Sequence, residues 1–167
     1  MTTSSSGIDT RLFRDVCGNF ATGVSVVTMV GESGPRGLTA NAISALSLDP
    51  TLFLVCVDLG ATSYPVIDEA GKFAINLLAE DQEDVSNFFA GTTSADNPMG
   101  EIEYHMSDLG SPLIEGSLAW LDCRTHSILD GGDHKIFVGE VASCEIVRPE
   151  ADPLLFFRGR YRGIRPQ

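Results

Sequence analysis

The chain has 167 residues, enough for one domain with a sizeable hydrophobic core and too few for two ordinary domains. Hydrophobic residues make up 43% and charged residues 20%, which is typical of a globular protein rather than a disordered or fibrous one. The formal net charge is −12, so the chain would repel phosphate backbones and anionic lipid headgroups, and we expect neither nucleic acid nor a membrane as a partner. An anionic cofactor would need help from backbone N–H groups or a few placed cations.

The cysteines and the N-terminal residues point to an intracellular protein. The four cysteines have no C-x-x-C pair and no histidine at metal-ligand spacing, so we expect reduced thiols rather than a zinc site or disulfides. Residues 1–7 are predicted to be a disordered tail and lack the basic and apolar regions of a secretory signal. The longest apolar run, residues 52–57, is far too short to span a bilayer. Residues 8–167 are therefore expected to form one cytoplasmic domain.

The first half of the chain predicts one helix and several strands. Apolar residues between Ile8 and Phe20 share one helical face, while Arg14, Asp15 and Asn19 lie on the other. The segments that follow are a β-branched strand at 24–30, a turn at 31–37, a stretch of alternating small and apolar residues at 38–48, and a buried strand at 51–57.

The second half predicts two short helices and the longest strands. In chain order we expect a helix at 63–70, a strand at 73–78, a helix at 80–89, a long surface excursion at 91–112, strands at 117–128 and 135–147 joined by a hairpin turn at 129–134, and a strand at 153–157 before the arginine-rich end. Strands and helices do not alternate regularly, which argues against a doubly wound sheet. The pattern favours a mostly β (α+β) fold, an antiparallel barrel with a few peripheral helices.

Several familiar catalytic motifs are absent. Gly31, Gly34 and Gly37 form G-x-x-G-x-x-G, but a strand-like segment follows instead of the helix that a dinucleotide phosphate site requires. The sequence contains no Walker A, G-x-S-x-G or H-E-x-x-H motif. The three histidines, at positions 105, 126 and 134, are too scattered to predict a metal site. Hydrolase and NTPase functions therefore have no support.

The stretch from Gly37 to Pro50 is the most informative feature. Small or hydroxylated residues recur along a predicted strand, and such residues let a flat ligand approach the backbone closely. Backbone amides and hydroxyls there could bond the pyrimidine edge of an isoalloxazine ring. An ordinary strand with a polar solvent face explains the same spacing.

Nearly the whole chain, roughly residues 10 to 163, is similar to the short-chain flavin reductases. The motifs that carry the resemblance occur in order at 20–24, 37–41, 44–50, 54–58, 73–80, 88–90, 130–134, 137–141 and 159–161. Each is weak alone, but together they form a strong signal. The resemblance implies a split β-barrel of Greek-key type, a homodimer, and hydride transfer from NADH to flavin. It also implies a separate flavin-dependent oxygenase that receives the reduced flavin by diffusion.

The resemblance also assigns residues to the two ligands. Those expected to bind flavin are Thr39, Ala40, Asn41, Ala42, Ser44, Ala45, Leu46 and Ser47 along the ring and ribityl chain, Cys56, Val57 and Asp58 beside the ring, Thr62 and Ser63 at the phosphate, and Phe88, Phe89 and Ala90 near the phosphate or adenosine end. Those expected on the nicotinamide side are His134, Arg160 and Tyr161. FAD is the expected flavin with FMN as the alternative, and NADH is expected over NADPH because the acidic chain has no evident arginine cluster for a 2′-phosphate.

Several of these residues also have an ordinary structural explanation. Cys56 would serve equally as a small buried hydrophobe, and His134 as an exposed hairpin histidine. Asp130 and Asp133 flank two glycines, which indicates turn chemistry rather than a metal cluster. An arginine-rich terminus could simply balance an acidic protein.

One departure from the family pattern concerns the phosphate. Many relatives carry a lysine or arginine in the turn before the phosphate-binding serine, whereas this chain has Gly60-Ala-Thr-Ser63. A flavin that comes and goes as a substrate fits this turn better than one held permanently. The alternative functions are a non-catalytic flavin carrier and an FMN-dependent oxidase on a related barrel.

Overall fold

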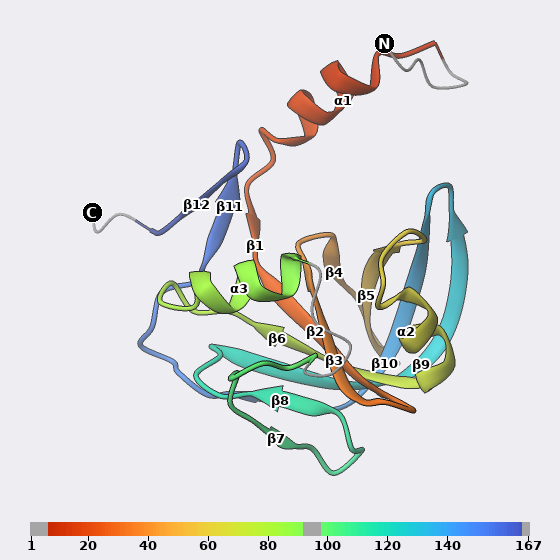
Figure 1. Cartoon of the computed structure of the whole chain (residues 1–167), viewed down its shortest axis with the longest axis vertical. Helices are drawn as coiled ribbons and strands as arrows, with labels where there is room; N and C mark the ends of the chain where they lie inside the picture. The colour runs from red at the N-terminus through yellow and green to blue at the C-terminus, as the bar shows by residue number, and fades with distance from the viewer. Residues whose placement is uncertain (1–6, 92–97, 165–167) are drawn as a thin grey trace.

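The computed structural model describes residues 7–91 and 98–164. Its centre is a seven-stranded antiparallel sheet. In spatial order the strands are β3 (Gly34–Ala40), β2 (Ser25–Gly31), β6 (Lys72–Leu77), β9 (Ala119–Gly131), β10 (His134–Ile146), β5 (Thr51–Asp58) and β4 (Ile43–Leu48). The mostly β class with a few helices is confirmed, and Figure 1 shows the sheet strongly coiled.

The two end strands of this sheet are consecutive in the chain. Only Asn41 and Ala42 separate β3 from β4, and the N–H of Cys56 on β5 donates to the carbonyl of Ala42 at 2.9 Å. The coiled sheet encloses a core that includes Val27, Phe73 and Phe137, each fully buried. The link between β3 and β4 therefore lies at the rim of the core rather than far from it.

Two helices cover parts of the sheet. The helix α2 (Tyr64–Ala70) packs against β2 and β6, and α3 (Glu83–Ala90) packs against β3 and β2. Pro65 stands in the first turn of α2, where its missing N–H costs no hydrogen bond, and Gly71 ends that helix in the left-handed conformation at φ 67°. Acidic Glu83 and Asp84 open α3, where the helix dipole favours negative charge.

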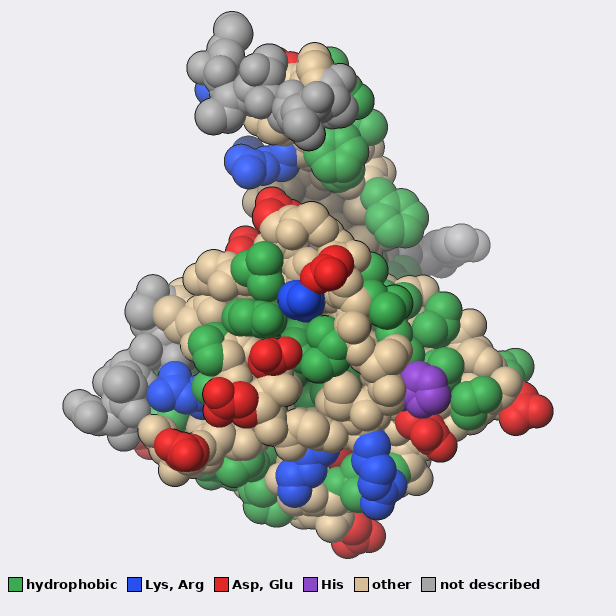
Figure 2. Space-filling view, turned by 90° about the vertical axis from the view of Figure 1, so that its right-hand side faces the viewer, with side chains coloured by type: hydrophobic (Ala, Val, Ile, Leu, Met, Phe, Trp, Pro, Cys, Tyr) green, Lys and Arg blue, Asp and Glu red, His purple; other side chains and the backbone are tan. Residues whose placement is uncertain are grey.

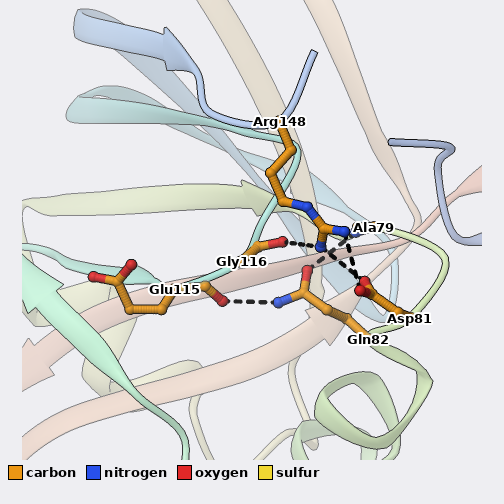
Figure 3. A network of polar contacts seen from close by, with 6 residues as sticks. All are labelled: Ala79, Asp81, Gln82, Glu115, Gly116 and Arg148. Atoms are coloured by element: carbon orange, nitrogen blue, oxygen red, sulfur yellow. Dashed lines mark hydrogen bonds and ion pairs between the residues drawn. The ribbon is translucent and has the colours of Figure 1, made fainter. Parts of the chain in front are cut away.

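The start of α3 is fixed by a polar network (Figure 3). The Arg148 guanidinium donates to both carboxylate oxygens of Asp81, at 2.9 and 3.0 Å, and to the carbonyl of Gly116 at 2.9 Å. The Gln82 side chain accepts from the N–H of Ala79 and donates to the carbonyl of Glu115. This network joins the loop before α3 to the loop before β9 and to the residues after β10. The Arg148 guanidinium lowers the pKa of Asp81, chiefly through their hydrogen bond.

Smaller strands flank the central sheet. The pair β7 (Tyr104–Met106) and β8 (Pro112–Ile114) forms one hairpin. The strands β1 (Thr22–Gly23), β11 (Leu155–Phe157) and β12 (Arg160–Arg162) form a three-stranded sheet between the inner end of α1 and the C-terminus (Figure 1). Arg158 and Gly159 connect β11 to β12 with φ of 51° and 73°, as the tight primed turns of hairpins require.

The helix α1 (Thr10–Cys17) stands away from the rest of the molecule (Figure 1). Asp9 caps it by accepting from the N–H of Arg11 at 2.8 Å, and none of its residues is buried. Its apolar side chains Leu12, Phe13 and Val16 are each about 60% exposed. Figure 2 shows the hydrophobic side chains along one side of this extension. No described helix is long and apolar enough to cross a membrane.

The structure corrects several predicted boundaries. The turn predicted at 31–37 is confined to Glu32 and Ser33, because residues 34–37 pair with β2 as part of β3. The stretch 38–48 is two strands rather than one. The excursion predicted at 91–112 contains β7, and β12 forms within the arginine-rich end. Residues 1–6 of the predicted tail lie outside the described residues.

Candidate functional site

A groove with a volume of about 470 Å³ lies where β3, β5 and α3 meet. Its floor is the end of β3 and the link to β4, one wall is the C-terminal end of α3, and the other is the turn between β5 and α2. The lining residues are Gly37, Leu38, Thr39, Ala40, Asn41, Ala42, Cys56, Asp58, Gly60, Ala61, Thr62, Ser63, Phe89, Ala90, Gly91 and His134. Most are small or hydroxylated, so much of the surface is open backbone.

The α3 wall is packed directly on the floor. A Cβ atom on Gly37 would lie 2.7 Å from Cε1 of Phe89, so the absence of a side chain there lets the ring approach the strand. The hydroxyl of Thr39 donates to the backbone carbonyl of Ser86 at 2.6 Å. One glycine and one hydroxyl on β3 thus set the position of α3.

The opposite wall is shaped by Asp58 and Ser63. The Asp58 carboxylate accepts from the N–H of Gly60 at 2.6 Å, and its backbone carbonyl accepts from the N–H of Ala61, which bends the chain at the end of β5. The buried Ser63 hydroxyl donates to the carbonyl of Gly37 at 3.2 Å and fastens this turn to β3.

The same turn presents hydrogen-bond donors to a ligand. The backbone N–H groups of Thr62 and Ser63 have no acceptor among the described residues, and the Thr62 side chain is exposed. Within the described part of the lining, no lysine or arginine is present. An anionic group bound here would be held by backbone N–H groups and hydroxyls, as the sequence predicts for the Gly60–Ser63 segment.

His134 enters the groove from the first position of β10, where it pairs with Asp58. Its Nδ1 lies 2.7 Å from Oδ1 of Asp133. A carboxylate can only accept, so Nδ1 carries the hydrogen, and Nε2 has no partner among the described residues. The hydrogen bond from His134 lowers the pKa of Asp133.

Cys56 lines the groove without the features of a nucleophile. Burial raises the pKa of its thiol, so the thiol stays protonated at neutral pH. Its contribution is the small side chain that it places beside the floor, together with the backbone bond to Ala42.

The structure brings together most of the residues predicted for flavin. In the groove lie Thr39, Ala40, Asn41, Ala42, Cys56, Asp58, Thr62, Ser63, Phe89 and Ala90, joined by His134 from the nicotinamide group. Outside its lining are Ser44, Ala45, Leu46 and Ser47 on the edge strand β4, Val57 in the core, Phe88, and the C-terminal Arg160 and Tyr161. Their predicted ligand roles stay predictions.

The reasons for these differences are local. Val57 alternates with Cys56 and Asp58 along β5, so its side chain points to the core, where it is 1% exposed. The Phe88 ring packs over Gly100, where a Cβ atom would lie 2.6 Å from its Cζ. The sequence does not assign a ligand to five lining residues, Gly37, Leu38, Gly60, Ala61 and Gly91. The first four of these nevertheless lie in two segments with residues expected to bind flavin, 37–41 and 60–63.

Comparison with known proteins identifies the family. Residues 17–165 match the flavin reductase like domain. The chain is 44% identical over 164 residues to the reductase subunit HsaB of a flavin-dependent monooxygenase from Mycobacterium tuberculosis, covering 98% of this chain and 87% of that protein. It is 40% identical over 160 residues to a flavin reductase of Pseudomonas putida, covering 95% and 92%.

Solved structures agree with this assignment. Nitrilotriacetate monooxygenase component B from Mycobacterium thermoresistibile superposes with a TM-score of 0.88 at 43% identity, covering 97% of this chain and 90% of that one. An NADH:FAD oxidoreductase of Streptomyces globisporus gives a TM-score of 0.89 at 36% identity, covering 95% of both chains. The chain belongs to the flavin reductase-like family.

Proposed function

We propose that this chain is an NADH-dependent flavin reductase, the reductase component that supplies reduced flavin to a two-component monooxygenase. The observation that carries the proposal is the groove of small and hydroxylated residues between β3, α3 and the turn after β5, in a chain of this family. The reaction moves a hydride from NADH to the flavin ring, and the redox chemistry belongs to the two bound molecules. The protein's part is to bind them, align them and keep the reacting faces in contact.

We place the flavin ring and ribityl chain over the floor at residues 39–42. Small side chains at Ala40 and Ala42 leave room for a flat ring against the backbone, and Asn41 can bond a ring edge. Cys56 and Asp58 border the ring from β5. The phosphate lies at Thr62 and Ser63, where two backbone N–H groups are without acceptors among the described residues. We propose that the residues of β4 also belong to the flavin site when two copies of the chain assemble.

Nicotinamide lies on the His134 side of the groove. Asp133 holds Nδ1 of this histidine and thereby orients the ring, which leaves Nε2 to donate to or accept from a ligand group once the site is filled. Arg160 and Tyr161 lie on the C-terminal hairpin, outside the groove lining. Tyr161 lines a smaller pocket of about 150 Å³ that shares Thr39, Asn41 and Ala90 with the groove, and a nicotinamide contact from the hairpin would be made from that side.

A flavin that is exchanged on each cycle fits this groove better than one held permanently. The described lining offers no cationic side chain to a phosphate, and the net charge of −12 adds no long-range attraction. FAD is the expected substrate and FMN the alternative. A non-catalytic carrier or an oxidase with bound FMN would instead retain flavin through purification.

We also propose that the chain works as a cytoplasmic homodimer with a split-barrel sheet. The consecutive end strands β3 and β4, joined at the rim by Asn41 and Ala42, support the barrel. The apolar face of α1 is uncovered in the monomer, Phe20 beyond it is 78% exposed, and Leu48 on the edge strand β4 is 92% exposed. A second copy of the chain that covers these surfaces would remove apolar area from water and would also cover a free edge of the sheet.

The first test separates the two ligands at residue level. Ser63→Ala removes the hydrogen bond that fastens the turn to β3. The loss of one neutral hydrogen bond, about 0.5–1.5 kcal/mol, should weaken flavin binding by a few-fold to roughly tenfold, with little effect on the NADH requirement. His134→Ala should raise the NADH requirement or slow flavin reduction while flavin affinity stays near wild type. Flavin fluorescence titration and stopped-flow reduction over a range of NADH concentrations measure the two effects.

His126→Ala is the matched control for the histidine. His126 lies on β9 of the same hairpin, exposed, with its Nδ1 3.8 Å from Glu140 and outside the groove lining. This control should leave both flavin affinity and the reduction of flavin by NADH unchanged. If His134→Ala also leaves both unchanged, the nicotinamide assignment is wrong. If His134→Ala weakens only flavin binding, the two ligands have been placed in each other's positions.

A further inference from the structure

The C-terminal hairpin contacts α3 through residues that lie outside the lining of the flavin groove. Tyr161 on β12 is half-buried, with its ring edge-on to Phe156 at a centroid distance of 5.5 Å. Its hydroxyl lies 2.8 Å from the Ser86 hydroxyl and 3.1 Å from Oδ1 of Asn87. One atom of the hairpin therefore meets two successive residues of α3.

The direction of these hydrogen bonds follows from the donors available. An amide oxygen can only accept, so the tyrosine hydroxyl donates its single proton to Asn87. The Ser86 hydroxyl must then donate to the tyrosine oxygen. Ser86 is fully buried, so without Tyr161 its hydroxyl would lose the hydrogen-bond partner that it has among the described residues.

Ser86 is also the residue through which α3 is tied to the groove floor. Its backbone carbonyl accepts from the hydroxyl of Thr39, a lining residue. Three residues later, Phe89 lies against Gly37 and forms the wall of the groove. The chain of contacts runs from the hairpin to the middle of α3, and from there to both the floor and the wall.

We propose that Tyr161 is a positioning residue for the flavin groove: its hydroxyl, bonded to Ser86 and Asn87, holds α3 at the separation from β3 that gives the groove its width. This inference rests on the proposed flavin reductase function. It gives Tyr161 a role exerted through α3 and not through contact with nicotinamide. The hairpin thus determines how well flavin is held, and the hydride step itself is left to the bound molecules.

The test is Tyr161→Phe, which keeps the ring on Phe156 and removes only the hydroxyl. The KM and the dissociation constant for flavin should rise roughly three- to tenfold, as expected for the loss of neutral hydrogen bonds. The KM for NADH and the kcat at saturating flavin should stay within about twofold of wild type. Tyr104→Phe, the same change on the exposed strand β7, is the matched control and should alter none of these constants.

A double-mutant cycle tests whether the effect passes through α3. Ser86→Ala should raise the flavin KM to a similar degree, and the pair Ser86→Ala with Tyr161→Phe should add little to either single change. Asn87→Asp keeps the acceptor and should bind flavin more nearly like wild type than Asn87→Ala does.

The other outcomes would contradict either the role of Tyr161 or the proposed function. A rise in the NADH KM with unchanged flavin binding would make Tyr161 a nicotinamide contact and overturn the inference. A lower melting temperature with both KM values unchanged, or fully additive single changes, would overturn it as well. A wild-type protein that binds flavin but does not oxidise NADH would refute the proposed function, while flavin titration of the same variants would still decide the role of Tyr161.

Discussion

Gly37 is the position where a single added methyl group should disturb both the stability and the groove. A Cβ atom there would lie 2.7 Å from Cε1 of Phe89 and 3.1 Å from Cγ1 of Val26, against an ordinary contact of at least 3.4 Å. The Phe89 ring would have to withdraw by about 0.7 Å, the difference between 3.4 and 2.7 Å. Phe89 is 4% exposed and Val26 is fully buried, so neither can swing into solvent.

Overpacking of this kind costs about 1–3 kcal/mol, and the reduced freedom of the unfolded chain returns about 0.4–1 kcal/mol. We therefore expect Gly37→Ala to lower the free energy of unfolding by about 1–2 kcal/mol, or the melting temperature by roughly 2–8 °C for a chain of this size. Since Phe89 is the groove wall, the flavin KM should rise in the same variant.

Thermal unfolding and steady-state kinetics check both effects against Gly23→Ala. The Cβ of this control would have no atom within 4 Å, and Gly23 lies outside the groove lining. It should stay within about 0.5 kcal/mol of wild type. A Gly37→Ala protein that melts with the wild type and keeps its flavin KM would refute the close packing of α3 on β3.

Three further predictions concern stability and assembly. Because the folded-state pKa of Asp81 is lowered by Arg148, its stabilisation is present near neutrality and is lost as the pH falls through that pKa; Asp81→Asn should therefore melt earlier than wild type at about pH 7, and the difference should shrink as the pH falls below the ordinary carboxyl pKa of 3.8. Asp122 is fully buried, and both its carboxyl oxygens lack hydrogen-bond partners among the described residues, so Asp122→Asn, which places no negative charge in the core, should raise the free energy of urea unfolding; a loss of stability would mean that the carboxylate has a partner. Phe13→Glu should convert the proposed homodimer to a monomer by light scattering, while Arg11→Glu on the same helix should not; a wild-type monomer with full activity would contradict the proposed homodimer.

Regular elements of the fold were predictable because their sequence patterns are strong. The helical stripe from Ile8 to Phe20 correctly predicts α1, but the sequence pattern does not show that no residue of this helix is buried in the chain by itself. Glycine and proline at 31–37 indicated a long turn, yet Gly34 and Gly37 belong to a strand, one at a hairpin corner with φ of 99° and the other beneath an aromatic ring. Composition cannot separate these two uses of glycine.

The candidate site was predictable where its residues are close in sequence. The segment 39–42 lies in the groove as a unit because it links two strands at the rim. The role of Ser86 was not visible, since it depends on partners at Thr39 and Tyr161, far away along the chain. Phe88 and Phe89 look alike in sequence, and only the packing of α3 decides which ring faces the groove.

The most direct test of the central claim is the oxidation of NADH by the purified protein with and without added flavin. The account predicts a protein that is colourless after purification, consumes little NADH alone, and consumes it rapidly once free FAD or FMN is added, with the reduced flavin reoxidised by oxygen. No turnover with FAD, FMN or riboflavin would contradict the account, as would the same rate before and after flavin is added.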